Sequence, residues 1–495
     1  MKRPRMQKTS PPDGAPALEA ALAGGIFAVL ERQALRNGSR VAIRTSGGEA
    51  TFAELYAGCR RALDRLRRLA GRPVGLAMEP SAAWVWMAGA LAQLRAHLFL
   101  LSPDLDRARR EELAVQFSIQ AMAGPDGEIR DLAGAGDGSE AGAQDGSEAG
   151  AQGGSEAGAG DGSKAGAAGV TLFTSGSTGT PKAVTHSWAG LMRPVRQRPE
   201  LEGGRWLLTY PVRFYAGLQV LLQSLASGGT LTVADRRSAG GVCRQIRAEG
   251  IQYVPATPSF WRWLLAFGDR EALEESAVRQ ISLGGEPVSD ELLGALGAVF
   301  PAARIVHIYA TSELGRCFAV DDGRAGFPAS YLARCPEPGT SLRIVEGELQ
   351  VRSENAMQGY ETAGRSWEGS RWLATGDLVG VADGRVRFGG RQSEIINVGG
   401  HKVSPVEVES ALRRVPGIAD LCVYPVASSL AGQMVAADLV LAPGSRPEEA
   451  RQAIARECAT RLASSQRPRI LRFVDRLAVL ESGKLDRRAQ PGSAA

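Results

Sequence analysis

The sequence predicts an α/β protein with a large N-terminal part and a smaller C-terminal part. Strand-like runs such as VAIRTS (41–46) and VGLAM (74–78) alternate with stretches whose apolar residues recur at helical spacing, such as ELYAGCRRALDRLRRL (54–69). Beyond about residue 391 a second α/β alternation begins, which includes VEVESALRRV (406–415). At 495 residues, the chain is long enough for two domains with separate cores.

The alternation continues from residue 205 to residue 311 with longer apolar runs. The strand-like runs are WLLTYPV (206–212), GTLTVA (229–234), RQISLGG (279–285) and ARIVHIYA (303–310). The helical runs between them are LQVLLQSLAS (218–227), SFWRWLLAF (259–267) and DELLGALGAVF (290–300). From about 340 to 390 short strands and turns replace the helices, and Asp383-Gly384 is typical of a hairpin turn.

Charge and cysteine content favour a cytoplasmic enzyme that handles anionic metabolites. A formal charge of +5 is small for this length and argues against nucleic acid, which requires a clustered basic stripe. The six cysteines are scattered without a C-x-x-C pair, so free thiols are expected instead of disulfides or zinc. The apolar run at 82–101 is interrupted by Gln93, Arg95 and His97, which predicts a buried helix followed by a strand and no membrane span.

The expected organisation is a disordered N-terminus (1–20), an N-terminal domain (21–391) and a C-terminal domain (392–490). A low-complexity segment at 134–168 interrupts the N-terminal domain and contains four octets, DGSEAGAQ, DGSEAGAQ, GGSEAGAG and DGSKAGAA, over 137–168. An octet without a large apolar side chain cannot bury a face, which excludes a solenoid. A flexible insertion is therefore expected.

The segment TLFTSGSTGTPKAV (171–184) is rich in groups that bind phosphate. Hydroxyl and ammonium groups are hydrogen-bond donors, and glycines allow backbone N–H groups to turn inward. The residues concerned are Thr174, Ser175, Gly176, Ser177, Thr178, Gly179, Thr180 and Lys182. The segment is not a Walker loop, because Pro181 precedes Lys182 and Ala183 follows it. Composition alone leaves a phosphate-binding loop and a polar turn as alternatives.

Six further segments follow this loop in a fixed order. They are LGGEPV (283–288), IYATSE (308–313), GELQVRS (347–353) with Gly359-Tyr360, ATGDLV (374–379), GRQSEIINVGGHKVSPVEVE (390–409) and SGKLDR (482–487). Together with the loop they resemble the signature motifs of the superfamily that joins acyl-CoA synthetases, adenylation domains of peptide synthetases and luciferases. The resemblance implies an N-terminal adenylate-forming domain of αβαβα layers with a small β-barrel-like part, and a smaller, mobile α+β C-terminal domain.

The resemblance also implies how ATP and Mg²⁺ are bound. The loop at 174–182 would close over the β- and γ-phosphates, Tyr309 would stack on adenine, and Asp377 would hold both ribose hydroxyls. The implied nucleotide-binding residues outside the loop are Gly284, Gly285, Glu286, Tyr309, Ala310, Thr311, Ser312, Asp377, Arg391 and Lys484.

Catalytic roles are implied for Lys484, Glu313 and Thr178. Lys484 would stabilise charge at the α-phosphate, and Glu313 would ligate Mg²⁺, a hard cation that prefers oxygen ligands.

The implied reaction has two halves. A small-molecule carboxylic acid attacks ATP to give an acyl-adenylate, and a thiol then displaces AMP; the thiol belongs to coenzyme A or to the phosphopantetheine of a carrier protein. Between the halves the C-terminal domain would rotate about Ser393. This rotation would remove Lys484 from the active site and bring in the surface formed by Val398, Gly399 and Gly400, where the paired glycines let a pantetheine arm pass close to the backbone.

The expected acyl pocket includes Phe214, Tyr215, Gly217 and His307. Adenylation domains of peptide synthetases hold the substrate amine with an Asp, whereas the corresponding PVRFYAGLQ (211–219) has no acidic residue. An apolar or aromatic acid is therefore expected. For His307 a place in the nucleotide or acyl pocket and a place in the core both remain open.

Departures from the family pattern are mild. Ala310, Ser312 and Asn397 replace Gly, Thr and Lys, and the hinge position is Ser393; none of these changes removes a catalytic group. Three hypotheses follow: a carboxylate–CoA ligase, a stand-alone adenylating enzyme that loads an acyl carrier protein, and an inactive nucleotide-binding scaffold. Intact Lys484, Glu313 and Asp377 argue against the scaffold.

Overall fold

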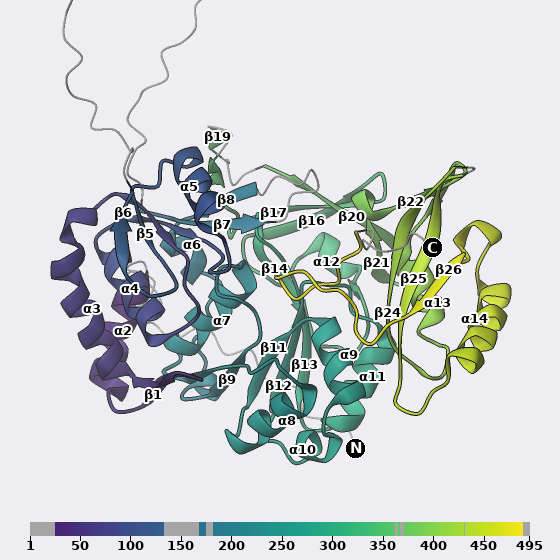
Figure 1. Cartoon of the computed structure of the whole chain (residues 1–495), viewed down its shortest axis with the longest axis horizontal. Helices are drawn as coiled ribbons and strands as arrows, with labels where there is room; N and C mark the ends of the chain where they lie inside the picture. Colours follow the sequence, from purple (N-terminus) through teal and green to yellow (C-terminus); the bar gives the residue numbers. More distant parts are fainter. Residues whose placement is uncertain are drawn as a thin grey trace, which may run out of the picture.

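The computed structural model describes residues 25–132, 168–174, 182–361, 365–366, 371–429 and 431–488 (Figure 1). The predicted disordered N-terminus, the octets up to residue 167 and residues 175–181 of the predicted phosphate loop lie outside the described residues. The described residues form two large sheets, a smaller antiparallel sheet and a C-terminal sheet.

The first large sheet is parallel in its middle and antiparallel at both edges. Across the sheet its strands are β14 (Gly315–Val320), β13 (Arg304–Thr311), β12 (Gln280–Gly284), β11 (Tyr253–Ala256), β9 (Arg205–Leu208), β10 (Thr230–Val233), β1 (Val41–Thr45) and β2 (Gly48–Thr51). The strand-like runs predicted between 206 and 310 form β9, β10, β12 and β13.

The second large sheet carries the ends of the predicted phosphate loop. Across this sheet the strands are β19 (Arg365–Ser366), β18 (Gly359–Tyr360), β8 (Lys182–His186), β7 (Val170–Thr174), β4 (His97–Leu100), β3 (Pro73–Leu76), β5 (Ala121–Ala123) and β6 (Ile129–Asp131). Strands β7 and β8 are antiparallel, with Thr174 opposite Lys182. The loop therefore leaves and re-enters the sheet at adjacent positions.

Helices cover both faces of each large sheet. The helices that contribute to the core shared by the two sheets are α2 (Gly25–Asn37), α3 (Phe52–Leu66), α4 (Ala82–Gln93), α6 (Trp188–Met192) and α7 (Tyr215–Ala226). The helices on the outer faces are α5 (Arg107–Gln116), α8 (Ala239–Ala248), α9 (Pro258–Phe267), α10 (Arg270–Glu274) and α11 (Asp290–Val299), with short helices η1 (Arg67–Leu69) and η2 (Pro199–Leu201) in connections.

Successive side chains of a strand point to opposite faces of its sheet, and the clusters that they join show the order of the layers. Leu98 of β4 belongs to the shared core, whereas Phe99 packs with α5 on the opposite face. Likewise Leu208 of β9 belongs to the shared core and Leu207 packs under α8, α9 and α11. The layers are therefore α5, second sheet, shared helices, first sheet and outer helices, which is the predicted αβαβα order.

The apolar run at 82–101 forms α4 and β4, as predicted. Ser81 begins α4 by accepting a hydrogen bond from the backbone N–H of Trp84, and Leu98 to Leu100 are buried. Among the helices of the described residues, none has the length and apolarity needed to cross a membrane.

The antiparallel sheet lies next to the edge strands β13 and β14. Its strands, in order, are β15 (Phe327–Pro328), β21 (Arg385–Arg391), β20 (Leu373–Ala382), β17 (Glu348–Ser353) and β16 (Thr340–Val345), and α12 (Ser330–Ala333) precedes β16. The predicted turn at Asp383-Gly384 joins β20 to β21, with φ of 51° and 69°. Phe318 of β14 packs with Phe327 and Val386 in this core.

The C-terminal part has a core of its own. Its strands are β23 (His401–Val403), β22 (Ile396–Val398), β25 (Gly432–Leu441), β24 (Ile418–Ser428) and β26 (Ile470–Phe473), and its helices are α13 (Pro405–Leu412), α14 (Pro447–Arg461), η4 (Gln392–Glu394) and η5 (Ser464–Gln466). Figure 1 shows this part beside α9 and α11, and the yellow segment after β26 returns toward the N-terminal part.

Candidate active site

The predicted nucleotide residues lie at the carboxyl ends of two neighbouring parallel strands. Gly284 ends β12, where it pairs with Ile308 of β13, and Tyr309 and Thr311 follow on β13. This edge is where open α/β sheets bind ligands. Gly285 follows with φ of +88°, which a residue with a side chain adopts only under strain. The edge therefore presents bare backbone.

Asp377 joins two of the predicted residues in one hydrogen-bonded group. The Tyr309 hydroxyl donates to Asp377 Oδ2 at 2.6 Å, and Arg391 Nε donates to Asp377 Oδ1 at 3.0 Å. The Tyr309 ring stacks with Phe318 and Phe388 at centroid distances of 5.1 and 5.3 Å. Burial, with the Asp377 charge, raises the pKa of Tyr309 well above its ordinary value, so the phenol is a neutral donor.

Glu313 lies between the first sheet and the end of the predicted phosphate loop. Its backbone C=O accepts from Met357 N at 2.8 Å, and its Oε1 lies 3.5 Å from the Tyr360 hydroxyl. Lys182 Nζ lies over the Tyr360 ring, 5.8 Å from its centroid. Burial and the Glu313 carboxylate raise the pKa of Tyr360 to about 12.

The surroundings of Glu313 fit Mg²⁺ as it is usually held beside a nucleotide. Within the described residues, no group of three or more His, Cys, Asp and Glu side chains forms a metal cage. Mg²⁺ commonly takes one or two carboxylates, substrate phosphates and waters, so a single carboxylate is a sufficient protein ligand.

Lys484 lies on a hairpin that the C-terminal part places against this edge. Leu480 N donates to the Lys484 C=O, and Gly483 N donates to the Leu480 C=O, both at 2.8 Å. A Cβ built on Gly285 would lie 3.2 Å from Lys484 Cε, so the lysine stem runs along the bare backbone. Burial lowers the pKa of Lys484 and Arg391 acts in the same direction, while Glu286, Asp377 and Glu313 oppose the shift. The buried Lys484 amine thus lies within reach of the charges of three carboxylates.

Three of the four predicted acyl-pocket residues, Phe214, Tyr215 and Gly217, lie at the start of α7, whereas His307 lies on β13. Gly217 allows the close approach of this helix to the preceding turn, because a Cβ there would lie 2.2 Å from the Pro211 carbonyl oxygen. Tyr215 is buried, and its hydroxyl accepts from Arg316 N at 3.2 Å. Its ring lies 5.6 Å from that of His186, whose Nε2 donates to the Ser312 carbonyl at 2.7 Å.

Both buried histidines near this region are neutral. Burial lowers the pKa of His186 to about 4. Burial also lowers the pKa of His307, whose Nε2 donates to the Arg324 carbonyl at 3.1 Å. The ring of His307 is thus hydrogen-bonded to the connection between β14 and β15, which fits the core alternative.

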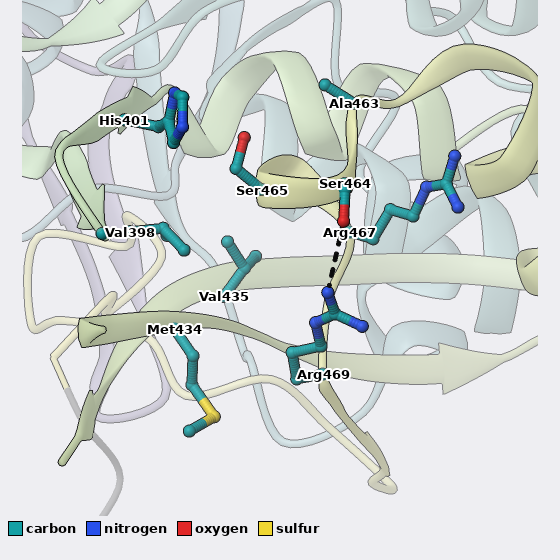
Figure 2. A pocket seen from close by; sticks show the side chains of 10 residues that line it. Val398, His401, Met434, Val435, Ala463, Ser464, Ser465, Arg467 and Arg469 are labelled. Atoms are coloured by element: carbon teal, nitrogen blue, oxygen red, sulfur yellow. Dashed lines mark hydrogen bonds between the residues drawn. The ribbon is translucent and has the colours of Figure 1, made fainter. Parts of the chain in front are cut away.

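The predicted thiol path lies on the turn between β22 and β23. Gly399 and Gly400 have φ of +57° and +87°, and a Cβ on either would meet nothing within 4 Å. The adjacent cavity has a volume of about 430 Å³ (Figure 2). Its lining residues are Val398, Gly399, His401, Met434, Val435, Ala463, Ser464, Ser465, Arg467 and Arg469. Figure 2 shows Arg469 beside Ser464, to whose Oγ it donates at 3.4 Å.

Sequence comparison decides the family. The sequence profile of the AMP-binding enzymes matches residues 30–361, and that of the AMP-binding enzyme C-terminal domain matches 407–484. The chain belongs to the AMP-binding enzyme family. The 4-coumarate–CoA ligase-like 9 of Oryza sativa subsp. japonica is 29% identical to it over 345 residues, which are 64% of this chain and 62% of that protein. The chain therefore covers less than two thirds of that relative's length.

Other relatives agree with this family. The 2-succinylbenzoate–CoA ligase of Bacillus licheniformis is 29% identical over 343 residues, 65% of this AMP-binding enzyme and 69% of that ligase. The crystal structure of the anthranilate CoA ligase AuaEII with anthranoyl-AMP superposes with a TM-score of 0.71 at 19% identity, covering 93% of this chain and 95% of that one. This likeness supports the shared fold of a large N-terminal and a smaller C-terminal domain.

The structure of this AMP-binding enzyme brings together Lys484, Glu313, Asp377, Arg391 and Tyr309. Tyr309 and Glu313 come from the first large sheet and the turn that follows β13, Asp377 and Arg391 from the antiparallel sheet, and Lys484 from the C-terminal hairpin. Ala310 and Thr311 end β13, Ser312 follows in the next turn, and Phe214 directly precedes α7. Thr178 and its loop neighbours at 175–181 lie outside the described residues, and Ser393 lies in η4, between the antiparallel and C-terminal sheets.

Two contacts at this site have no counterpart in the sequence motifs. The first is the contact of the Thr257 hydroxyl with the Gly483 carbonyl in the Lys484 hairpin. In the sequence, ATPSF (256–260) indicates only a helix N-cap, and Thr257 does cap α9. The other is the contact between Tyr360 and Glu313, which joins two motifs 47 residues apart. The distance along the sequence between the two partners predicts neither contact.

Proposed function

We propose that this AMP-binding enzyme joins a carboxylic acid to coenzyme A by way of an acyl-adenylate. The observation that carries this proposal is the position of Lys484, a buried lysine whose stem runs along the bare backbone of Gly285 and whose amine interacts electrostatically with Arg391, Asp377 and Glu313. A positive charge fixed in a site of this kind stabilises negative charge that develops during a reaction.

In the first half-reaction a carboxylate oxygen of the acid attacks the α-phosphorus of ATP. The bond from this phosphorus to the bridging oxygen breaks, and pyrophosphate leaves with the electron pair. Lys484 stabilises the charge on the α-phosphate, and Asp377 and Arg391 hold the ribose. Glu313 would hold Mg²⁺, which neutralises charge on the phosphates. The loop at 174–182 would cover the β- and γ-phosphates.

In the second half-reaction the thiol sulfur attacks the acyl carbon, the thiol proton passes to solvent, and AMP leaves with the electron pair. The C-terminal domain, over 392–490, would turn about Ser393 and bring Gly399 and Gly400 to the site in place of Lys484.

Coenzyme A is the acceptor that the cavity beside Gly399 favours. Arg467, Arg469, Ser464 and Ser465 offer guanidinium and hydroxyl donors suited to phosphate. Coenzyme A carries a diphosphate and a 3′-phosphate beyond its pantetheine arm, whereas a carrier protein presents one phosphodiester. Arg467 also caps the end of α14, since its Nε donates to the Leu462 carbonyl at 3.0 Å, so Arg469 is the cleaner residue to vary.

The acid is proposed to be apolar or aromatic. The segment from Pro211 to Gln219 has no carboxylate to hold a substrate amine, and the nearby His186 and Tyr215 are neutral, since burial lowers the pKa of the first and raises the pKa of the second. A charged α-amino group would therefore lose its hydration without a partner.

The test is ATP–pyrophosphate exchange with a panel of benzoates, cinnamates, fatty acids and amino acids, followed by trapping with coenzyme A or a phosphopantetheinylated carrier protein. We expect exchange with an apolar or aromatic acid and a thioester with coenzyme A. Arg469→Ala should raise KM for coenzyme A but not for pantetheine, and Met434→Leu is the matched control in the same cavity. Exchange with transfer to the carrier protein alone would support the carrier-loading alternative, and no exchange with any acid would support the scaffold.

A further inference from the structure

Two side chains of the N-terminal part hold the Lys484 hairpin by its backbone. The Thr257 hydroxyl donates to the Gly483 carbonyl at 3.1 Å, and Glu286 Oε1 accepts from Leu485 N at 2.8 Å. The two backbone groups flank Lys484 directly, one residue before it and one after it. Fixing both neighbours fixes the direction in which the lysine side chain leaves the hairpin.

These two side chains are themselves held rigidly. Thr257 is 2% exposed, and its hydroxyl also accepts from Phe260 N at 3.1 Å, in the first turn of α9. Glu286 Oε2 accepts from Ser259 N at 2.9 Å, in the same turn. Both oxygens of the Glu286 carboxylate are therefore occupied by backbone N–H groups, one from each part of the chain. The resemblance implies a nucleotide contact for Glu286, but its hydrogen bonds are to the lysine hairpin and to α9.

Gly285 completes the arrangement between Gly284 and Glu286. Its missing side chain leaves the space along which the Lys484 stem runs, with Cε 3.2 Å from the position of a Cβ. One short segment thus provides bare backbone for the lysine stem and a carboxylate for the lysine's neighbour.

A further contact of the hairpin is weaker. Arg213 pairs with Glu481 at 3.1 Å and the Ser102 hydroxyl lies 3.3 Å from the same carboxylate, but the Glu481 side chain is 56% exposed. Exposed ion pairs contribute little, whereas hydrogen bonds to a charged group inside an interface are stronger. The pair at Glu481 therefore provides a control at the same hairpin.

We propose that Thr257 and Glu286 are positioning residues that clamp the Lys484 hairpin for the adenylation half-reaction and release it for the thioester half-reaction. The clamp is formed between partners 226 and 199 residues apart, so it exists only while the C-terminal part is docked in this arrangement. This proposal rests on the proposed function, because it assigns the clamp to the step that Lys484 serves.

The clamp is tested with Glu286→Ala and Thr257→Val, with Thr257→Ser as the conservative variant and Glu481→Gln as the matched control. Thr257→Val also loses the α9 cap, and Thr257→Ser retains both hydrogen bonds. We expect Glu286→Ala and Thr257→Val to lower kcat of pyrophosphate exchange about 10- to 100-fold, with KM for ATP nearly unchanged. Thr257→Ser should restore exchange, and Glu481→Gln should stay within about twofold of the original protein. Thioester formation from a supplied acyl-adenylate should be unaffected in all four variants.

A double-variant cycle shows whether the clamp acts through Lys484. In a Lys484→Ala background, Glu286→Ala should cause no further loss of exchange, because the group that it positions is already missing. An additional loss as large as in the lysine-containing protein would overturn the proposal and indicate a direct contact with the nucleotide.

Hydrogen–deuterium exchange provides a readout that is independent of activity. In Glu286→Ala, amide exchange in a peptide covering 480–487 should rise about tenfold, while peptides from α14 and β25 keep their rates. Unchanged exchange at 480–487 would overturn the clamp. If the original protein failed to catalyse pyrophosphate exchange with any acid, the proposed function would fall, and with it the role of the clamp in adenylation.

Discussion

Replacing Asp377 with alanine removes the carboxylate that joins Tyr309 to Arg391 and is proposed to hold the ribose. A carboxylate has about four acceptor positions, of which Tyr309 and Arg391 use one each, which leaves two for ribose hydroxyls. Hydrogen bonds to a charged acceptor contribute about 1.5–3 kcal/mol each. Loss of both should therefore weaken AMP binding by at least about 3 kcal/mol, or roughly 100-fold in Kd.

The cost to folding should be smaller than the cost to binding. Arg391 is 48% exposed and can be hydrated when its partner is lost, so this ion pair contributes at most about 1 kcal/mol. Tyr309→Phe provides the matched control, because it removes the 2.6 Å hydrogen bond but keeps the Asp377 charge.

Titration calorimetry with AMP, alongside urea unfolding, measures both effects. Asp377→Ala should bind AMP at least about 100-fold more weakly than the original protein, and the Kd of Asp377→Asn should lie between those two. The Kd of Tyr309→Phe should stay within about threefold of the original value. A folded Asp377→Ala protein that binds AMP as tightly as the original would refute the ribose assignment.

Three further perturbations test other parts of the account. Deletion of 137–168 should leave the urea midpoint and exchange rate near those of the full chain, because loop length costs only about 0.6 kcal/mol per doubling; insoluble protein would show that the octets contribute to packing. Tyr215→Ala should shift acid preference toward bulkier substrates by about 1–3 kcal/mol per added methylene, measured as kcat/KM, whereas an unchanged profile would place the pocket elsewhere. The folded pKa of His186 is about 4 against 6.5 ordinarily, so the unfolded chain binds the proton more tightly. Stability should therefore fall by about 3 kcal/mol as pH drops from 6.5 to 4, and urea unfolding of His186→Gln, which keeps an N–H donor toward Ser312, should show a smaller fall.

The layers of the fold follow from local patterns in the sequence. The apolar runs at 206–212 and 303–310 predicted strands, which form β9 and β13, and Gln93 to His97 marked where α4 ends and β4 begins. The turn at Asp383-Gly384 could be predicted from two residues alone, because Asp-Gly is a common hairpin sequence. The strand order could not be read in this way, because pairings such as β1 with β10 join residues nearly 190 positions apart.

At the site, motifs predicted residue identities better than contacts. Asp377, Arg391 and Tyr309 were each assigned to the nucleotide, and the structure adds that they bond to one another. Glu286 was assigned to the nucleotide as part of LGGEPV, yet its carboxylate is occupied by two backbone N–H groups.

Thr257 and His307 show why the rest could not be predicted. The bond of Thr257 to Gly483 spans 226 residues, and a hydroxyl that meets a backbone carbonyl leaves no pattern in either segment. His307 lies two positions before Tyr309, but the direction of its side chain depends on where Arg324 is placed by the connection after β14.

The central claim is that different faces of the C-terminal part serve the two half-reactions, and separate assays of Lys484→Ala test it most directly. Lys484 touches the site only through the docked hairpin, so its loss should slow pyrophosphate exchange by about 100- to 1,000-fold, as for removal of one charge-stabilising donor. The same variant should convert a supplied acyl-adenylate and coenzyme A to thioester at nearly the original rate, and Gly400→Leu should show the reverse pattern. A folded Lys484→Ala protein that lost both half-reactions equally would contradict the claim.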